Sequence, residues 1–218
     1  MALHHNPRIV TDGLVLALDA ADVNSYPGSG TTWYDLSSNG NDGTLTNGPT
    51  FSSDHVGALV FDGANDHIAL STAITLTDFT ATAVYSISSY NGGWAMLFGN
   101  SDLDNFIGIG TSGAILRIQD TNSTNSDLAY NSIEDQLTFL QVVQSGNSNT
   151  WYINGQSVGN STNNSYAGIE ITHMVHYGTG SSLGIFGGKY YLAHLYNRAL
   201  TASEIQQNYE AQKTRFGL

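Results

Sequence analysis

The chain has 218 residues, no cysteine, and a formal net charge of −12 from six basic and eighteen acidic side chains. The absence of cysteine excludes disulfides and thiolate metal sites, and so few cations cannot form the basic surface that nucleic acids require. The negative charge disfavours acidic membranes, and no apolar run reaches the length of a membrane helix. Abundant glycine and scarce proline between short apolar runs indicate one turn-rich β domain.

The predicted elements begin after a polar N-terminal arm at residues 1–12. Residues 13–19 (GLVLALD) form a nearly continuous apolar run, which is typical of a strand buried on both faces. Residues 57–61 and 67–70 flank the turn sequence DGAND and predict a β-hairpin. Residues 79–87 alternate between apolar and polar side chains, so one face of that strand can be buried.

The second half of the chain continues the pattern of short strands and glycine-rich turns. Two further hairpins are predicted, 106–109 with 115–118 and 137–144 with 150–154. Asn154 and Gly155 form a strong tight-turn signal that leads into another strand. Residues 119–127, rich in asparagine, serine and threonine, are expected to be a loop.

The C-terminal stretch predicts a closing strand followed by a helix. Residues 190–196 are rich in β-forming side chains that alternate between two faces. Thr201 and Glu204 have the spacing of a capping box at a helix start. Ile205 and Tyr209 then lie one turn apart and give the helix a narrow apolar edge, so the helix needs a sheet to lie on. The pattern as a whole predicts two antiparallel sheets packed face to face.

Five segments span nearly the whole chain in an order typical of one family: GLVLALDAAD (13–22), WYDLSSNGNDGTL (33–45), GALVFDGANDHI (57–68), WYINGQSVG (151–159) and GIFGGKYYLAHLYNRALTASEI (184–205). Together they resemble the LamG-like members of the concanavalin A-like lectin/glucanase superfamily. The resemblance implies an all-β, two-sheet antiparallel jelly-roll sandwich with a short C-terminal helix, as a single domain at residues 13–218. The HHNP arm before IVTDGLVL is also similar to family members found in phage, including cyanophage, virion proteins.

The superfamily includes retaining glucanases, which place a nucleophile and an acid about 5 Å apart across the sugar bond. Alternate positions on one strand supply that separation. Four glutamates occur here, and none lies two to four residues from another: Glu134, Glu170, Glu204 and Glu210. The sequence departs from the glucanase pattern and predicts a protein that is not an enzyme.

Aromatic side chains are the first candidates for sugar binding, because their rings pack on the apolar face of a pyranose. Most of them lie in predicted strands, where they fill a sandwich core by default. Tyr90, Asn91 and Trp94 flank a glycine-rich turn and are the best exposed candidates for a glycan site.

Two loops carry oxygen-rich clusters of the kind that Ca²⁺ prefers: Asp62 with Asn65 and Asp66, and Asp35 with Asn39, Asn41 and Asp42. The first cluster is the calcium candidate, and no other cofactor is expected. In the alternative, these side chains hydrogen-bond the backbone of their own turns. Two histidine pairs show no third ligand for a transition metal: His4 with His5, and His173 with His176.

These features predict a non-enzymatic phage virion structural protein, displayed on the particle surface as a capsid decoration or a tail or fibre component. The virion is its expected location, since no signal peptide is recognised and release by lysis fits. The expected partners are other capsid or tail proteins, further copies of the chain in a homo-oligomer, and a host-surface glycan. Two alternatives remain: a free carbohydrate-binding, lectin-like module, and a glycanase with a rearranged acid pair.

Overall fold

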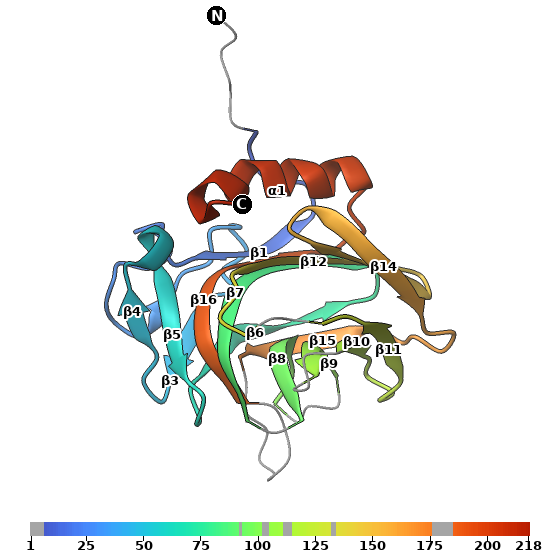
Figure 1. The fold of residues 1–218 in the computed structure, drawn as a ribbon, viewed down its shortest axis with the longest axis horizontal. Coiled ribbons are helices and arrows are strands. Elements are labelled where there is room, and N and C mark those ends of the chain that lie inside the picture. Colours follow the sequence, from blue (N-terminus) through green and yellow to red (C-terminus); the bar gives the residue numbers. More distant parts are fainter. Residues whose placement is uncertain (1–6, 92, 102–104, 111–114, 132–133, 176–184) are drawn as a thin grey trace, which may run out of the picture.

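The computed structural model describes residues 7–91, 93–101, 105–110, 115–131, 134–175 and 185–218. Within these ranges the chain forms two antiparallel eight-stranded sheets that pack face to face, with one α-helix lying across the outside of one sheet (Figure 1). This arrangement confirms the predicted all-β, jelly-roll sandwich with a C-terminal helix. In the described part of the chain, no helix is both long enough and apolar enough to cross a bilayer.

The sheet that carries the helix is called the helix-covered sheet. Its strands are β1 (Leu14–Asp19), β4 (Thr50–Ser52), β5 (Ala58–Asp62), β7 (Phe79–Asn91), β12 (Thr138–Ser145), β13 (Ser148–Ile153), β14 (Gln156–Thr162) and β16 (Ile185–Tyr196). They run in the order β14–β13–β12–β7–β16–β5–β4, and β1 also pairs with β16. The long strands β7 and β16 lie at its centre.

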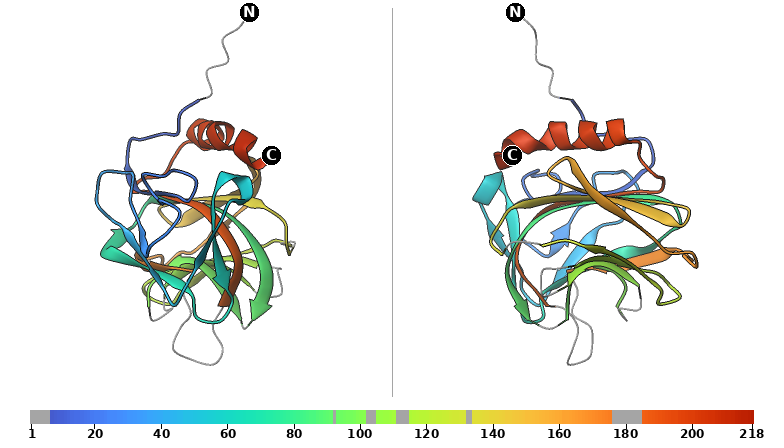
Figure 2. Two further views of the ribbon diagram at one scale, coloured as in Figure 1. Left: turned by 90° about the vertical axis from the view of Figure 1, so that its left-hand side faces the viewer. Right: turned by 45° about the vertical axis from the view of Figure 1, so that its right-hand side comes forward.

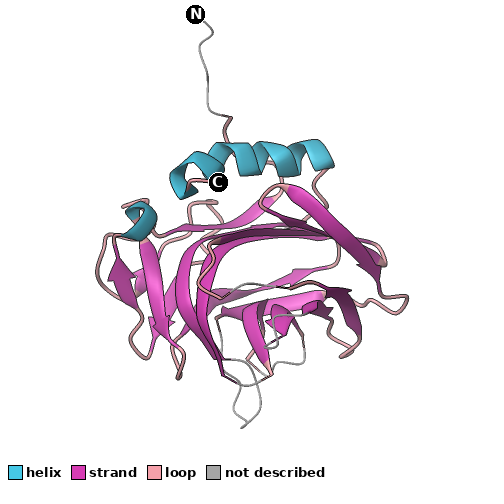
Figure 3. Ribbon diagram, in the orientation of Figure 1, coloured by secondary structure: helices cyan, strands magenta, loops and turns pink. Residues whose placement is uncertain are grey.

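The second sheet is called the opposite sheet. Its strands are β2 (Thr32–Trp33), β3 (Gly43–Thr46), β6 (His67–Leu76), β8 (Trp94–Gly99), β9 (Phe106–Gly110), β10 (Ile115–Gln119), β11 (Asn125–Ala129) and β15 (Ile169–Met174). They run in the order β11–β10–β9–β8–β15–β6–β3–β2. A 3-10 turn, η1 (Asp54–Val56), and the helix α1 (Ala202–Phe216) complete the described elements (Figure 3).

The hairpins with short connections form as predicted. β9 pairs with β10, β12 with β13, and β13 with β14. Asn154 (φ 48°) and Gly155 (φ 75°) both adopt the left-handed conformation that a tight hairpin turn requires. The predicted loop at 119–127 is wrong in part, because Asn125 begins β11, which pairs with β10 and extends the opposite sheet.

The predicted hairpin between residues 57–61 and 67–70 does not form. β5 pairs with β4 and β16, whereas β6 pairs with β3 and β15 in the other sheet. The DGAND turn therefore carries the chain across the edge of the sandwich. Leu59 and Phe61 then enter the core from one sheet and Ile68 from the other, so apolar side chains of both segments are buried between the sheets.

The closing strand β16 is buried on both faces. The predicted strict alternation fails between Tyr190 and Leu192, where the pairing with β7 shifts by a β-bulge. Tyr190 belongs to the main core between the sheets, whereas Tyr191 and Leu192 both pack in the cluster beneath the helix with Phe216. The bulge thus lets one strand supply large side chains to two cores.

The helix starts with the predicted capping box. Thr201 Oγ1 accepts a hydrogen bond from the Glu204 backbone N–H, and the Glu204 carboxylate accepts one from the Thr201 N–H. Ile205 and Tyr209 are buried against the sheet, and Gly217 ends the helix in the left-handed conformation. Figure 2 shows α1 lying along the outer face of the helix-covered sheet, with residues 7–12 beside it.

Candidate functional site

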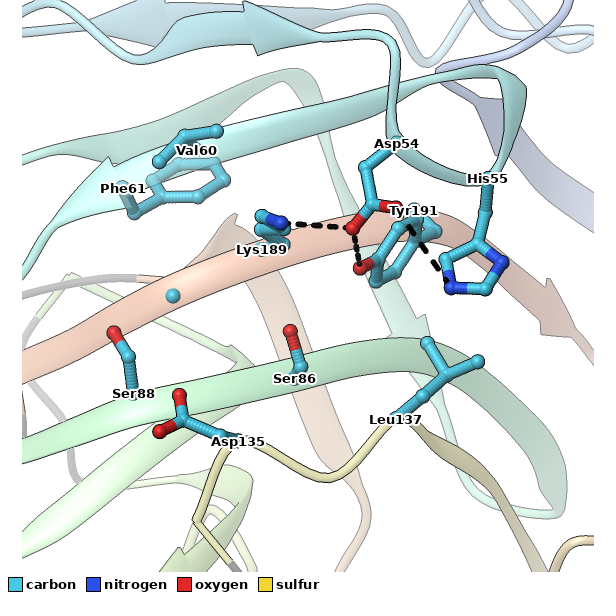
Figure 4. Close-up of a pocket in the computed structure, with 11 residues that line it drawn as sticks. Asp54, His55, Val60, Phe61, Ser86, Ser88, Asp135, Leu137, Lys189 and Tyr191 are labelled. Carbon is cyan, nitrogen blue, oxygen red and sulfur yellow. Dashed lines mark hydrogen bonds and ion pairs between the residues drawn. The ribbon is translucent and has the colours of Figure 1, made fainter. Parts of the chain in front are cut away.

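A pocket of about 360 Å³ opens on the outer face of the helix-covered sheet, beside the C-terminal end of α1. We call it the η1 pocket (Figure 4). Its lining comes from five segments: Asp54 and His55 of η1, Val60 and Phe61 of β5, Ser86 and Ser88 of β7, Asp135 and Leu137 before β12, and Gly188, Lys189 and Tyr191 of β16.

The strand periodicity explains why polar side chains line this pocket. On β7, Tyr85 and Ile87 point into the main core, so Ser86 and Ser88 point outward. On β16, Tyr190 points into the core and its neighbours Lys189 and Tyr191 line the pocket. The helix leaves this end of the outer face uncovered, so Ser88 and Lys189 stay accessible, whereas the Tyr191 ring is buried against the end of the helix.

The wall and floor of the pocket depend on close approach of β7 and β16. Gly188 has φ 150°, and a Cβ at this position would collide with the Ser86 carbonyl oxygen. Glycine is therefore required where the two strands approach. The pairing register of β7 and β16 shifts at the same point, between Gly187 and Gly188.

An ion pair closes one side of the pocket. The Lys189 ammonium lies 2.7 Å from Asp54 Oδ2, and the Tyr191 hydroxyl donates to the same oxygen at 2.9 Å. The hydrogen bond from Lys189 is the main reason why the pKa of Asp54 is lowered. Burial raises the pKa of Tyr191 to about 12, so at neutral pH this side presents a carboxylate, an ammonium and a protonated phenol.

The turn that carries Asp54 has an uncommon backbone. His55 (φ 43°) and Val56 (φ 73°) are both in the left-handed region, which costs on the order of 1–3 kcal/mol for such a residue. The Arg215 guanidinium donates to the carbonyls of His55 and Gly57 and pairs with Asp19 at 2.6 Å. The end of α1 thus holds η1 in place, and the His55 ring lies edge-on to Tyr191 at 5.5 Å.

The other side of the pocket is held by a tethered turn. The Asp135 backbone N–H donates to the Ile87 carbonyl at 2.7 Å, and Asp135 also has a left-handed φ of 58°. Figure 4 shows its carboxylate beside Ser88 along β7, across β16 from Asp54. The pocket therefore has carboxylates on two sides and hydroxyl groups between them.

The charged groups of the pocket are accessible from solvent. The Lys189 and Asp54 side chains are 38% and 37% exposed, so their ion pair contributes little to folding stability and remains open to a ligand. Donors and acceptors are mixed within a few residues, and Val60 and Leu137 add apolar contact. Such an arrangement suits non-covalent recognition of a small polar molecule.

The predicted glycan residues lie elsewhere. Tyr90 and Asn91 are at the end of β7 and their side chains lie outside the described residues. Trp94 begins β8 on the opposite sheet, where the Arg117 guanidinium covers its ring at 4.1 Å and Phe106 packs against it at 5.5 Å. Because Arg117 occupies one face of the Trp94 ring, less of that ring is free to stack on a sugar.

The first calcium candidate forms a hydrogen-bonded turn. Asp62 Oδ1 accepts from the Ala64 N–H at 2.8 Å, and Asp66 Oδ2 accepts from the Asp62 N–H at 3.0 Å. The Asn65 carbonyl accepts from the side chain of Asn47. In the second cluster, Asp35 accepts bonds from Ala17, Ser37 and Asn41.

Among the described residues, no three histidine or acidic side chains gather as metal ligands. His4, His5 and His176 lie outside the described ranges. The His173 ring on β15 lies 5.7 Å from the His67 ring. Calcium binding by Asp62, Asn65 and Asp66 stays a prediction.

The glutamates are dispersed. Glu204 pairs with Arg198 and Glu210 with Lys213, both on α1. Glu170 lies on β15 of the opposite sheet, and Glu134 is exposed in the turn before β12. The four glutamates thus lie on three separate segments: α1, β15 and the turn before β12.

Sequence patterns did not identify the η1 pocket. Two signals were present: a single lysine, Lys189, inside the apolar closing strand, and the serines at 86 and 88 on the polar face of a predicted strand. Neither pattern shows that β7 and β16 are neighbours, because strands 100 residues apart in sequence pair only in the tertiary structure.

Comparison with known proteins gives the family. The family model described as the concanavalin A-like lectin/glucanases superfamily matches residues 62–206. No curated protein sequence matches the chain.

Similar solved structures include domain 4 of AbnA, a GH43 extracellular arabinanase from Geobacillus stearothermophilus in complex with arabinotriose (TM-score 0.71, 17% identity, 89% of this chain and 97% of that chain). The binding domain of Paraclostridial Mosquitocidal Protein 1 (TM-score 0.64, 18% identity) is covered over 91% of this chain and 52% of that chain. The botulinum neurotoxin serotype D binding domain (TM-score 0.68, 13% identity) is covered over 93% and 53%.

The chain thus spans about half of each toxin binding domain. At sequence identities of 13% to 18%, the similarity to these structures shows a shared fold. The family match covers residues 62–206, which is well over half of the chain. This chain therefore belongs to the concanavalin A-like lectin/glucanase superfamily.

Proposed function

We propose that the chain is a non-catalytic carbohydrate-binding module and that the η1 pocket holds the sugar. The observation that carries this proposal is the pocket itself, about 360 Å³ in volume, in which hydroxyl, carboxylate, ammonium and phenol groups surround a small apolar wall. A sugar hydroxyl both donates and accepts hydrogen bonds, so it needs such mixed partners. The names of the similar structures, two binding domains and a domain in complex with arabinotriose, support the same class of function.

Each part of the pocket has a role in this proposal. Asp135 accepts from sugar hydroxyls, and Ser86 and Ser88 can donate or accept. Val60 and Leu137 contact the C–H groups of the ring. The hydrogen bond to Asp54 holds the Lys189 ammonium in place, so that another of its N–H groups can donate to the sugar in a fixed direction. Little side-chain conformational entropy is then lost when the sugar binds.

A glycan array followed by calorimetry tests the proposal. Ser88 is exposed on β7, and Ser88→Tyr places a ring in the pocket without burying a polar group. We expect it to weaken sugar binding at least about tenfold, the ratio that corresponds to about 1.4 kcal/mol. Ser157→Tyr, at an exposed serine of the edge strand β14, is the matched control and should bind as the wild type does.

The variant Trp94→Ala separates this site from the glycan site predicted on sequence. If Trp94→Ala abolishes binding and Ser88→Tyr does not, the sugar site is the predicted one at Tyr90, Asn91 and Trp94 and not the η1 pocket. Running the array in Ca²⁺ and in chelator tests the proposed calcium site at Asp62, Asn65 and Asp66. No bound glycan under either condition would contradict the carbohydrate-binding function.

We further propose that this module is displayed on a phage virion, attached to other capsid or tail proteins as a homo-oligomer. The resemblance of the arm to those of virion proteins supports this setting. Within the described part of the arm, the Arg8 carbonyl accepts a hydrogen bond from Gln207 of α1 at 2.7 Å, so the chain at residue 8 lies against the helix.

Immunogold labelling of purified particles tests the virion setting. Regular label on heads or tails is the expected result. Unlabelled particles with the protein free in the lysate would contradict it and favour a free lectin. Light scattering after size-exclusion chromatography measures the oligomeric state, and a strict monomer would contradict the homo-oligomer.

A further inference from the structure

We infer that the η1 pocket selects uncharged saccharides and discriminates against those that carry a carboxylate or sulfate group. This inference rests on the proposed sugar-binding function of the pocket and adds the chemical class of its ligand. Its basis is the balance of charge among the described residues that line the pocket, together with the partners that each charged group already has.

The cation of the pocket is already paired. Lys189 lies 2.7 Å from Asp54 Oδ2, and its ammonium is the group that an acidic sugar would need. His55 also faces Asp54, with 3.8 Å between its Nε2 and Asp54 Oδ1. An incoming anion would therefore have to compete with a carboxylate that is fixed by the backbone of η1.

Arg215 cannot take over this role. Its guanidinium pairs with Asp19 at 2.6 Å and donates to the carbonyls of His55 and Gly57. Moving it to a ligand would release the turn that carries Asp54. Arg215 therefore stabilises the η1 turn that carries Asp54 and does not bind the ligand directly.

The second carboxylate leaves the pocket with an excess of negative charge. Asp135 is exposed at the rim, across β16 from the ion pair. Counting Lys189 against Asp54 and Asp135, the pocket carries a net charge of about −1 when His55 is neutral. The chain as a whole carries −12, and this field also repels anions.

The negative charge of the pocket strengthens the binding of uncharged sugars and weakens that of acidic sugars. A sugar hydroxyl can donate to Asp135, and a bond to an ionised acceptor is stronger than one between neutral groups. A carboxylate or sulfate in the same place has no proton to donate and meets like charge. Discrimination by repulsion of the wrong ligand is a common source of specificity.

Paired probes measure this selectivity. Neutral and acidic forms of one glycan, such as lactose with sialyllactose and oligogalactose with oligogalacturonate, are compared by calorimetry at low ionic strength, where charge effects are largest. For the pair whose neutral member binds, we expect the acidic member to bind at least about tenfold more weakly.

Two isosteric variants assign the discrimination to the pocket. Asp135→Asn removes the excess negative charge, and Asp54→Asn releases Lys189 while keeping an acceptor for Tyr191. Each variant should reduce, by several-fold, the ratio of the neutral probe's affinity to the acidic probe's affinity. Asp12→Asn is the matched control: its side chain is 85% exposed beside Arg198, near the other end of α1, and it changes the net charge equally. The ratio should not change.

The possible outcomes separate the two proposals. An acidic probe that binds as tightly as its neutral partner, with both abolished by Ser88→Tyr, would overturn the selectivity and leave the sugar-binding function intact. A ratio that neither Asp135→Asn nor Asp54→Asn changes would also overturn it, because the pocket would not then be its source. Absence of binding to every probe would overturn the selectivity together with the proposed function.

Discussion

At the scale of one residue, His194 shows how burial on the helix side of β16 changes the protonation of a side chain. It lies on β16, 3% exposed, on the side away from the main core cluster, which holds its neighbours Ala193 and Leu195. Burial is the main cause that lowers its pKa from 6.5 to about 4; the Asp19 charge opposes this shift and the Arg215 charge adds to it. The histidine is therefore neutral in the folded protein at neutral pH.

This pKa predicts a loss of stability in mild acid. Between pH 6.5 and pH 4 the unfolded chain takes up a proton at His194 and the folded chain does not. The stability is thus fully present above pH 6.5 and is lost as the pH falls toward 4, by up to about 3 kcal/mol. Urea unfolding of the wild type and of His194→Gln at pH 7 and pH 5 measures it.

The variant carries no titrating group at this position, so its loss between pH 7 and pH 5 should be smaller. Equal losses in both proteins would contradict the assignment. The hydrogen bonds from Arg198 and Thr201 lower the pKa of the Glu204 carboxyl to about 2. Glu204 therefore changes stability mainly below the range from pH 7 to pH 5 used in this experiment.

At the scale of elements, local signals succeeded where the partners are close in sequence. The turn at Asn154 and Gly155 and the capping box at Thr201 each involve a few neighbouring residues. The turn at 62–66 has equally good local chemistry, yet it joins two sheets. Turn residues therefore show where the chain reverses direction. Which strand pairs with which is decided by segments that are distant in sequence.

The capping box gives a prediction for α1. Thr201→Ala removes the acceptor for the Glu204 N–H and should lower the free energy of unfolding by about 1 kcal/mol. Thr214→Ala, at an exposed position inside the same helix, replaces threonine with a better helix former and should be neutral or slightly stabilising. Chemical denaturation distinguishes the two, and equal effects would contradict a specific role for the cap.

At the scale of the whole molecule, a buried polar network joins the two ends of the chain. The Val10 N–H donates to Asn208 Oδ1 at 2.8 Å, and Tyr196 OH donates to the Val10 carbonyl at 2.9 Å. Asn208 Nδ2 donates to Tyr196 OH at 3.0 Å. The arm, the closing strand and the helix therefore satisfy one another's polar groups.

Removal of the arm should consequently destabilise the entire sandwich. Deleting residues 1–12 leaves the Asn208 carbonyl and the Tyr196 hydroxyl without these partners, which we expect to cost about 3 kcal/mol and to lower Tm by roughly 10 °C. Deleting residues 1–6 keeps every bond named here and is the control. A deletion of 1–12 that melts like the wild type would show that the network contributes little.

The sequence by itself determined the fold class, the short hairpins, the helix with its cap and the family, because each rests on periodicity or on residues close in the chain. Tertiary structure alone decided that β5 and β6 lie in different sheets, that β16 bulges to serve two cores, and that Asp54, Asp135 and Lys189 surround one pocket. The physical reason is that a strand's side-chain pattern specifies which face is buried, whereas its neighbours are chosen by packing across the whole sandwich.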